Sequence, residues 1–138
     1  MKILVSKCLL GENCRYKGDN CKSDKVLAYL EGHEIIPICP EQAGGLTIPR
    51  DPSEIVGNRV ISKSGKDVTA EYLKGASIAL KLAQKNKVDL VILKAKSPSC
   101  GVGLIYDGTF TGNKIPGNGV TADLLIKNGF KVITEEDL

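Results

Sequence analysis

The residues of this chain best suited to chemistry are its five cysteines: Cys8, Cys14, Cys21, Cys39 and Cys100. The apolar start of the chain is too short for a secretory leader, and polar residues follow at once, so we expect a cytoplasmic protein. Thiols stay reduced in the cytoplasm, and a disulfide framework is therefore not expected. The cysteines are then buried hydrophobic residues, metal ligands or nucleophiles.

Three of the cysteines follow predicted strands: Cys8 comes after residues 3–6, Cys39 after residues 34–38 and Cys100 after residues 88–93. In an open parallel sheet, ligands bind beyond the carboxyl ends of the strands. The loops that contain these cysteines emerge on one edge if the strands are parallel. We therefore expect the three thiols to share a site, provided that the second strand is not antiparallel.

The remaining pattern alternates helices and strands. Apolar residues recur at helical spacing over about 68–85, the clearest helix, with lysines on the opposite face. Further elements are predicted in sequence order: a helix from Ser23 or Asp24 to about Gly32, a hairpin within 54–66, an extended piece at 104–111, a helix at 119–128 and a strand at 130–134. This order predicts an α/β fold, with a small parallel sheet flanked by helices and a small hairpin insertion.

Size and composition limit the classes of function. At 138 residues the chain is expected to form a single domain over residues 1–138. No apolar run is long enough to span a bilayer, so no membrane partner is expected. The net charge of +3 comes from scattered lysines, and only 4% of the residues are aromatic. This balance suits a small anionic substrate and does not favour duplex nucleic acid.

Thiolates select iron–sulfur clusters or zinc. The chain has no Cys-x2-Cys pair, and the spacing matches no usual structural zinc site. Its only histidine, His33, lies between a predicted helix and strand, where a surface or capping role is expected. Ordinary clusters take four cysteines, so three ligands would leave one iron open, as a Lewis-acid catalyst requires. Cys14 is a possible fourth ligand or a nearby thiol, and Cys21 is expected to be a semi-exposed thiol without a role.

Several motifs together resemble the DUF523 family, which includes thiouracil desulfidases. The resemblance covers nearly the whole chain in order. It rests on Val5-Ser6-Lys7-Cys8-Leu9-Leu10-Gly11 with Cys14-Arg15-Tyr16, on Cys39-Pro40-Glu41-Gln42 with Gly44-Gly45-Leu46 and Pro49-Arg50, on Ser97-Pro98-Ser99-Cys100-Gly101, on Ile105-Tyr106-Asp107-Gly108-Thr109-Phe110, and on residues 117–122. Lys7 is a minor departure, because the family usually has a small residue there.

The resemblance implies a [4Fe–4S] cluster held by Cys8, Cys39 and Cys100, with zinc as the less favoured metal. It also implies a non-redox reaction in which the C=S group of a thiolated pyrimidine becomes C=O and sulfide leaves. The partner would be a thiolated nucleobase or nucleotide.

Under this interpretation two residues are catalytic candidates. Glu41 lies two residues from a ligand and can act as the acid and base for water attack, although an N-cap or a salt bridge is its ordinary alternative. The Ser97 hydroxyl can act beside it. Ser99 and Gly101 are predicted to contact substrate, through a hydroxyl group and through close backbone approach. The serines could equally shape a turn that contains proline.

Two other functions remain open from the residues alone. A non-catalytic cluster or zinc protein that senses redox state would contain metal but show no turnover. A metal-free thiol enzyme would use Cys14 or Cys100 as its nucleophile. Such an enzyme needs a positioned base, and the location of the only histidine makes this the least favoured alternative.

Overall fold

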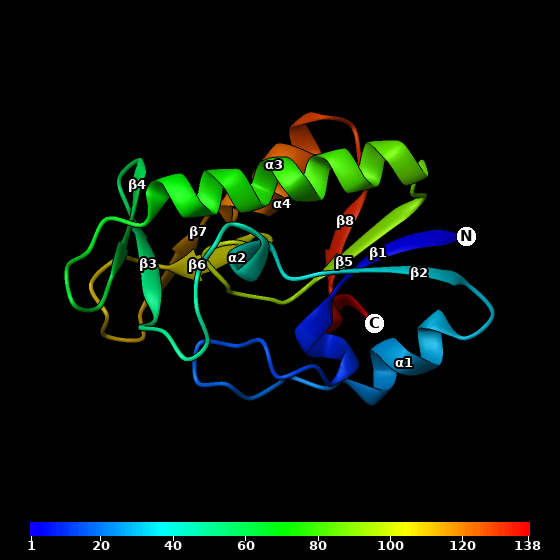
Figure 1. Ribbon diagram of the computed structural model, residues 1–138, viewed down its shortest axis with the longest axis horizontal. Coiled ribbons are helices and arrows are strands. Elements are labelled where there is room, and N and C mark those ends of the chain that lie inside the picture. Colours follow the sequence, from blue (N-terminus) through cyan, green and yellow to red (C-terminus); the bar gives the residue numbers. More distant parts are fainter.

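The computed structural model describes residues 1–138 and has a four-stranded sheet at its centre (Figure 1). In the order β2-β1-β5-β8, the strands are β2 (Glu34–Ile38), β1 (Lys2–Ser6), β5 (Leu90–Leu93) and β8 (Val132–Thr134). Every pairing in this sheet is parallel. The α/β prediction is confirmed, and so is the parallel second strand on which a shared cysteine edge depends.

Helices cover both faces of the sheet (Figure 1). On one face α3 (Thr69–Asn86) and α4 (Val120–Lys127) pack against strand residues such as Leu4. On the other face lie α1 (Asp24–Leu30) and the short 3-10 helix η1 (Lys7–Leu10), which pack near Ile3. The predicted helices 68–85 and 119–128 correspond to α3 and α4. None of the helices combines the length and apolar character that crossing a bilayer would require.

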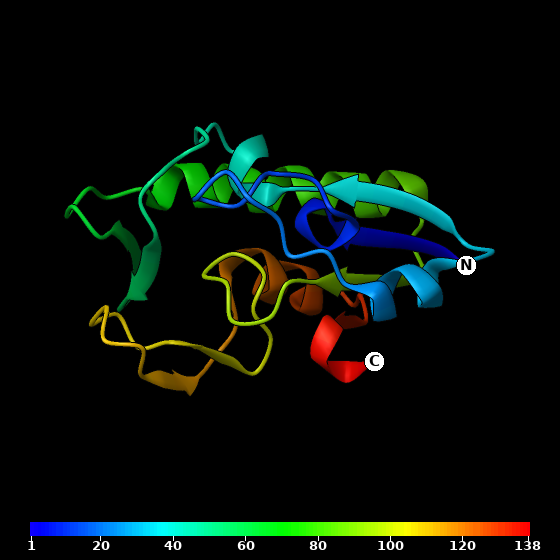
Figure 2. The ribbon, with the colours of Figure 1, turned by 90° about the horizontal axis from the view of Figure 1, so that it is seen from below.

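Two hairpins lie beyond the sheet, at one end of the molecule (Figure 2). The first, β3 (Ser53–Val56) with β4 (Arg59–Ser62), confirms the hairpin predicted within 54–66. The second was not predicted as a hairpin: β6 (Leu104–Tyr106) pairs with β7 (Lys114–Pro116), where only an extended piece at 104–111 was expected. The sequence of β7 is Lys114-Ile115-Pro116, and a single apolar residue before a proline gives no strand signal.

A helix of four residues, α2 (Pro40–Ala43), directly follows Cys39, at a position where no helix was predicted. Pro40 occupies the first turn, where proline is tolerated because its missing N–H would have no helical partner. This helix lies against α3 through two glycines. A Cβ atom at Gly44 would overlap the carbonyl oxygen of Glu71, and one at Gly75 would overlap that of Pro40. Backbone thus meets backbone at this crossing, and the contact fixes the position of α2.

We expect Gly75→Ala to destabilise the fold by about 1–3 kcal/mol, because the added methyl group must push α2 away from α3. Within an unconstrained helix the same change would stabilise by roughly 1 kcal/mol, so the sign of the effect isolates the close contact. Urea unfolding measures the difference. Lys74→Ala, at the exposed neighbouring position, is the control and should stay within about 0.5 kcal/mol of the parent. Equal or greater stability of Gly75→Ala would contradict the packing argument.

Candidate active site

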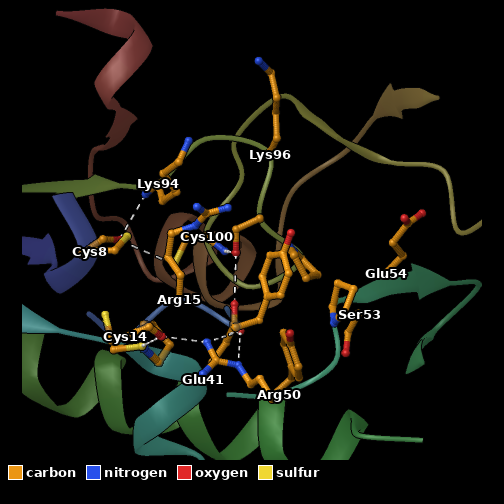
Figure 3. Close-up of a pocket in the computed structure, with 18 of the residues that line it drawn as sticks. Cys8, Cys14, Arg15, Glu41, Arg50, Ser53, Glu54, Lys94, Lys96 and Cys100 are labelled. Carbon is orange, nitrogen blue, oxygen red and sulfur yellow. Dashed lines mark hydrogen bonds and ion pairs between the residues drawn. The ribbon is translucent and has the colours of Figure 1, made fainter. Parts of the chain in front are cut away.

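A cavity of about 510 Å³ opens at the carboxyl ends of β1, β2 and β5 (Figure 3). Four of the five cysteines line it: Cys8, Cys14, Cys39 and Cys100. The structure therefore brings together the three cysteines that follow predicted strands, and it adds Cys14 to them. None of the cysteines forms a disulfide.

Local structure after each strand holds these cysteines in place. Cys8 lies in η1, directly after β1, and Cys39 is the N-terminal cap residue of α2. Cys100 is buried in the turn after β5, where the hydroxyl of Ser6, the last residue of β1, donates to its sulfur at 3.7 Å. The same Ser6 oxygen accepts the backbone N–H of Lys94 at 3.1 Å. The end of β1 is thus tied to the segment that contains Cys100.

Two residues that the sequence analysis set aside lie elsewhere. Cys21 does not line the cavity, and its backbone N–H donates to the carbonyl of Cys8. His33 also lies outside the cavity, where its Nδ1 contacts the N-terminal amino group at 2.9 Å. These placements agree with a thiol without a site role and with a histidine near the surface.

Ser97 connects the Cys100 turn to Glu41. Its Oγ accepts the backbone N–H groups of Ser99 and Cys100, at 3.0 and 3.1 Å. A hydroxyl group has two lone pairs and one proton, so these two bonds leave the proton free to donate. Oγ donates to Oε1 of Glu41, with 3.4 Å between the two oxygens. Ser97 therefore shapes the turn and also faces the carboxylate, so the two roles proposed for it are compatible.

Glu41 also forms the salt bridge foreseen as its alternative role. Arg50 donates through Nε and Nη2 to Oε2 of Glu41, at 3.1 and 2.9 Å. Both side chains are mostly shielded from solvent, with exposed fractions of 9% for Arg50 and 17% for Glu41. Two N–H groups on one oxygen fix the carboxylate strongly, while Oε1 stays directed at Ser97.

The surroundings raise the pKa of three cavity thiols, Cys14, Cys39 and Cys100, and so favour their neutral form. Burial raises the pKa of Cys100 to about 12, and the Glu41 charge adds to this shift. A hydrogen bond with Cys39 lowers the pKa of Cys14. The hydrogen bond with Cys8 and burial outweigh this effect, and the pKa of Cys14 is raised to about 11. The hydrogen bond with Cys14, followed by burial, raises the pKa of Cys39. A metal that binds these cysteines as thiolates must displace their protons.

Ser99 and Gly101, which were predicted to contact substrate, are not among the residues that line the cavity. The Ser99 side chain is 1% exposed, and its hydroxyl forms a 2.8 Å hydrogen bond with that of Thr121 in α4. Gly101 is needed for close backbone packing within the turn, where a Cβ atom would lie 2.8 Å from the carbonyl of Ser97. Both residues shape the turn that holds Cys100.

The two hairpins are joined across the cavity wall by Glu54. Its Oε1 accepts the backbone N–H groups of Gly108 and Phe110, at 2.9 and 3.3 Å. Glu54 and Phe110 both line the cavity. A buried carboxylate with two N–H donors holds the loop after β6 against β3, so the hairpins act together as one wall.

Known proteins with similar sequences and structures agree on the family. The family model described as 2-thiouracil desulfurase matches residues 3–137. The chain belongs to the 2-thiouracil desulfurase family. An uncharacterized protein of Bacillus subtilis, YbbK, is 44% identical, and the alignment covers 99% of this chain and 97% of that protein. A solved structure named [4Fe-4S]-dependent thiouracil desulfidase TudS superimposes with a TM-score of 0.93 at 44% identity, over 99% of this chain and 92% of that one.

As a member of the 2-thiouracil desulfurase family, the chain is a sulfur-removing enzyme, and its cavity is the candidate active site. No three Cys, His, Asp or Glu side chains are grouped as the ligands of a single metal ion would be. The four cavity cysteines come from different segments of the chain, and the Cys14 thiol is hydrogen-bonded to those of Cys8 and Cys39.

Sequence reasoning assigned no role to several residues of this desulfurase site. Arg50 lies in a loop rich in glycine and proline, and although Pro49-Arg50 belongs to the motifs of the family resemblance, no role was predicted for its side chain. Tyr72, on the inward face of α3, reads in sequence as a core residue. In the structure it lines the cavity, where burial and then the neighbouring Glu41 charge raise the pKa of its hydroxyl.

Proposed function

We propose that this protein hydrolyses thiouracil-type bases: the C=S group and water become C=O and sulfide, with no change of redox state. The observation on which the proposal rests is the Glu41–Ser97 pair inside a cysteine-lined cavity, in a chain of the 2-thiouracil desulfurase family. Family membership favours this enzyme over a redox-sensing protein that only binds metal.

The cofactor in this proposal is a [4Fe–4S] cluster held by Cys8, Cys39 and Cys100. The similar solved structure is named as [4Fe-4S]-dependent, and the donor set here consists of free thiols, which iron–sulfur clusters require. Zinc needs its donors around one ion, whereas each cysteine of a cluster binds a different iron atom. No group of three ligands around one point is present for zinc. Cys14 is the alternative fourth ligand.

When bound with three protein ligands, such a cluster supplies an open iron site, a Lewis acid for the sulfur of the substrate. The chain supplies the proton transfer. Oε1 of Glu41 accepts a proton from the water that attacks the ring carbon, and it returns that proton as sulfide leaves. Ser97, which donates to Oε1 at 3.4 Å, can exchange this bond for one to the water or to the ring.

The cavity has room for more than a pyrimidine ring. Its volume of about 510 Å³ lies within the usual range of small-molecule sites, roughly 300–1,000 Å³. Basic side chains also line it: Lys7, Arg15, Lys63, Lys94 and Lys96. Arg15, Lys94 and Lys96 are already paired with carboxylates of the chain, which leaves Lys7 and Lys63 available to an anionic part of a ligand. Size and charge together favour a thiolated nucleobase or nucleotide as the substrate.

Anaerobic reconstitution with iron and sulfide, followed by assays with 2-thiouracil and 4-thiouracil, tests the proposal. We expect sulfide release in equal amount to the uracil formed, with no added reductant or oxidant. The protein without iron should be inactive under the same conditions. If fully loaded protein released no sulfide from either base or from the corresponding nucleotides, the substrate assignment would be wrong.

A further inference from the structure

Arg50 occupies a position from which it can control the geometry of Glu41. Its side chain is 9% exposed, and every nitrogen of its guanidinium group donates a hydrogen bond. Nε and Nη2 donate to Oε2 of Glu41, Nη2 also donates to the carbonyl of Cys14 at 3.0 Å, and Nη1 donates to that of Thr47 at 3.2 Å. Figure 3 shows Arg50 beside Glu41, within the cavity lining.

This arrangement makes the two carboxylate oxygens of Glu41 unequal. Oε2 accepts two N–H groups from one planar guanidinium, whereas Oε1 accepts only the Ser97 hydroxyl, over a longer distance of 3.4 Å. Rotation of the carboxylate would break both bonds to Arg50. Oε1 is therefore the oxygen that remains available for exchange with water or substrate.

The hydrogen bonds that Arg50 donates to backbone carbonyls hold its guanidinium group in place. Cys14 and Thr47 come from two different loops, and the backbone N–H of Arg50 also donates to the carbonyl of Tyr16 at 2.8 Å. A lysine could retain the positive charge, but a single ammonium group cannot reproduce the planar arrangement of donors.

We propose that Arg50 is a positioning residue for desulfuration, which aims Oε1 of Glu41 at the reacting water by holding Oε2. This inference rests on the proposed function. It assigns Arg50 an effect that operates through Glu41, and not through contact with substrate or through the cysteine ligands.

A double-mutant cycle with Arg50→Lys and Glu41→Gln tests the inference in reconstituted full-length protein. Arg50→Lys should lower kcat by about 10- to 100-fold, because small misplacement of a reacting group has effects of this size, while KM for 2-thiouracil changes less than about threefold. In the Glu41→Gln background, Arg50→Lys should cause almost no further loss, because residues that act as one unit are not additive. Iron content and cluster absorbance should match those of the parent protein.

Arg59→Lys provides a matched control, because Arg59 forms a 2.9 Å ion pair with Asp67 outside the cavity. Its kcat should equal that of the parent.

Three results would overturn the inference: an unchanged kcat in Arg50→Lys, a full further loss in the double variant, or loss of iron in Arg50→Lys. If Arg50→Lys does not fold, Arg50→Gln in the same cycle decides between additive and non-additive losses. An inactive parent protein would instead refute the proposed function itself.

Discussion

Replacing Cys100 with serine should remove both the cluster and the activity. Cys100 is buried at the end of the cavity wall, and a hydroxyl group of nearly the same size keeps the turn but is a much poorer ligand for iron. Loss of residues that only support metal ligands already costs roughly 10- to 100-fold in activity, so loss of a ligand should cost more than about 100-fold. Iron and sulfide analysis, with absorbance near roughly 400 nm, measures the cluster directly.

Cys21→Ser is the matched control, because this thiol lies outside the cavity and should leave iron content and turnover unchanged. Cys14→Ser answers a separate question. If Cys14 is only a neighbouring thiol, this variant should retain iron, and if it is a fourth ligand, iron should be lost as in Cys100→Ser. Normal iron content and sulfide release in Cys100→Ser would contradict the proposed ligand set.

Glu41→Gln should lower kcat for sulfide release by about 10²- to 10⁴-fold, the usual contribution of a general acid–base residue. The amide is nearly isosteric, and its oxygen can still accept from Arg50, so the cavity should keep its shape. The amide cannot take up the proton of the attacking water. Steady-state kinetics with 2-thiouracil measures the loss, and iron content should equal that of the parent protein.

Glu31→Gln, an exposed glutamate at the end of α1, is the control and should have parental kinetics. Thermal unfolding must accompany the kinetics, because removal of one partner of a shielded ion pair destabilises the protein as well. A folded, iron-loaded Glu41→Gln protein with parental kcat would exclude Glu41 as the acid and base.

Local pattern was sufficient to predict the main elements of this fold. Hydrophobic spacing over 68–85 and 119–128 identified α3 and α4, and the apolar run at 88–93 identified β5. It failed for α2, which is about one helical turn that begins with a proline, and for β7, where an exposed Lys114-Ile115-Pro116 sequence offers a single apolar residue. The missed α2 matters most, since this helix contains Glu41 and follows directly after Cys39.

The sequence by itself determined that cysteines follow three strands, and its alternation of helices and strands favoured a parallel sheet. From these two facts the shared cavity of Cys8, Cys39 and Cys100 could be expected, because side-chain type and periodicity are properties of short segments. Only the tertiary structure decided which atoms face one another there. Arg50 meets Glu41 across 9 residues, the Cys14 carbonyl across 36, and Ser97 meets Glu41 across 56, while Ser99 turns toward Thr121. Such contacts depend on how loops pack in space, and no local pattern encodes them.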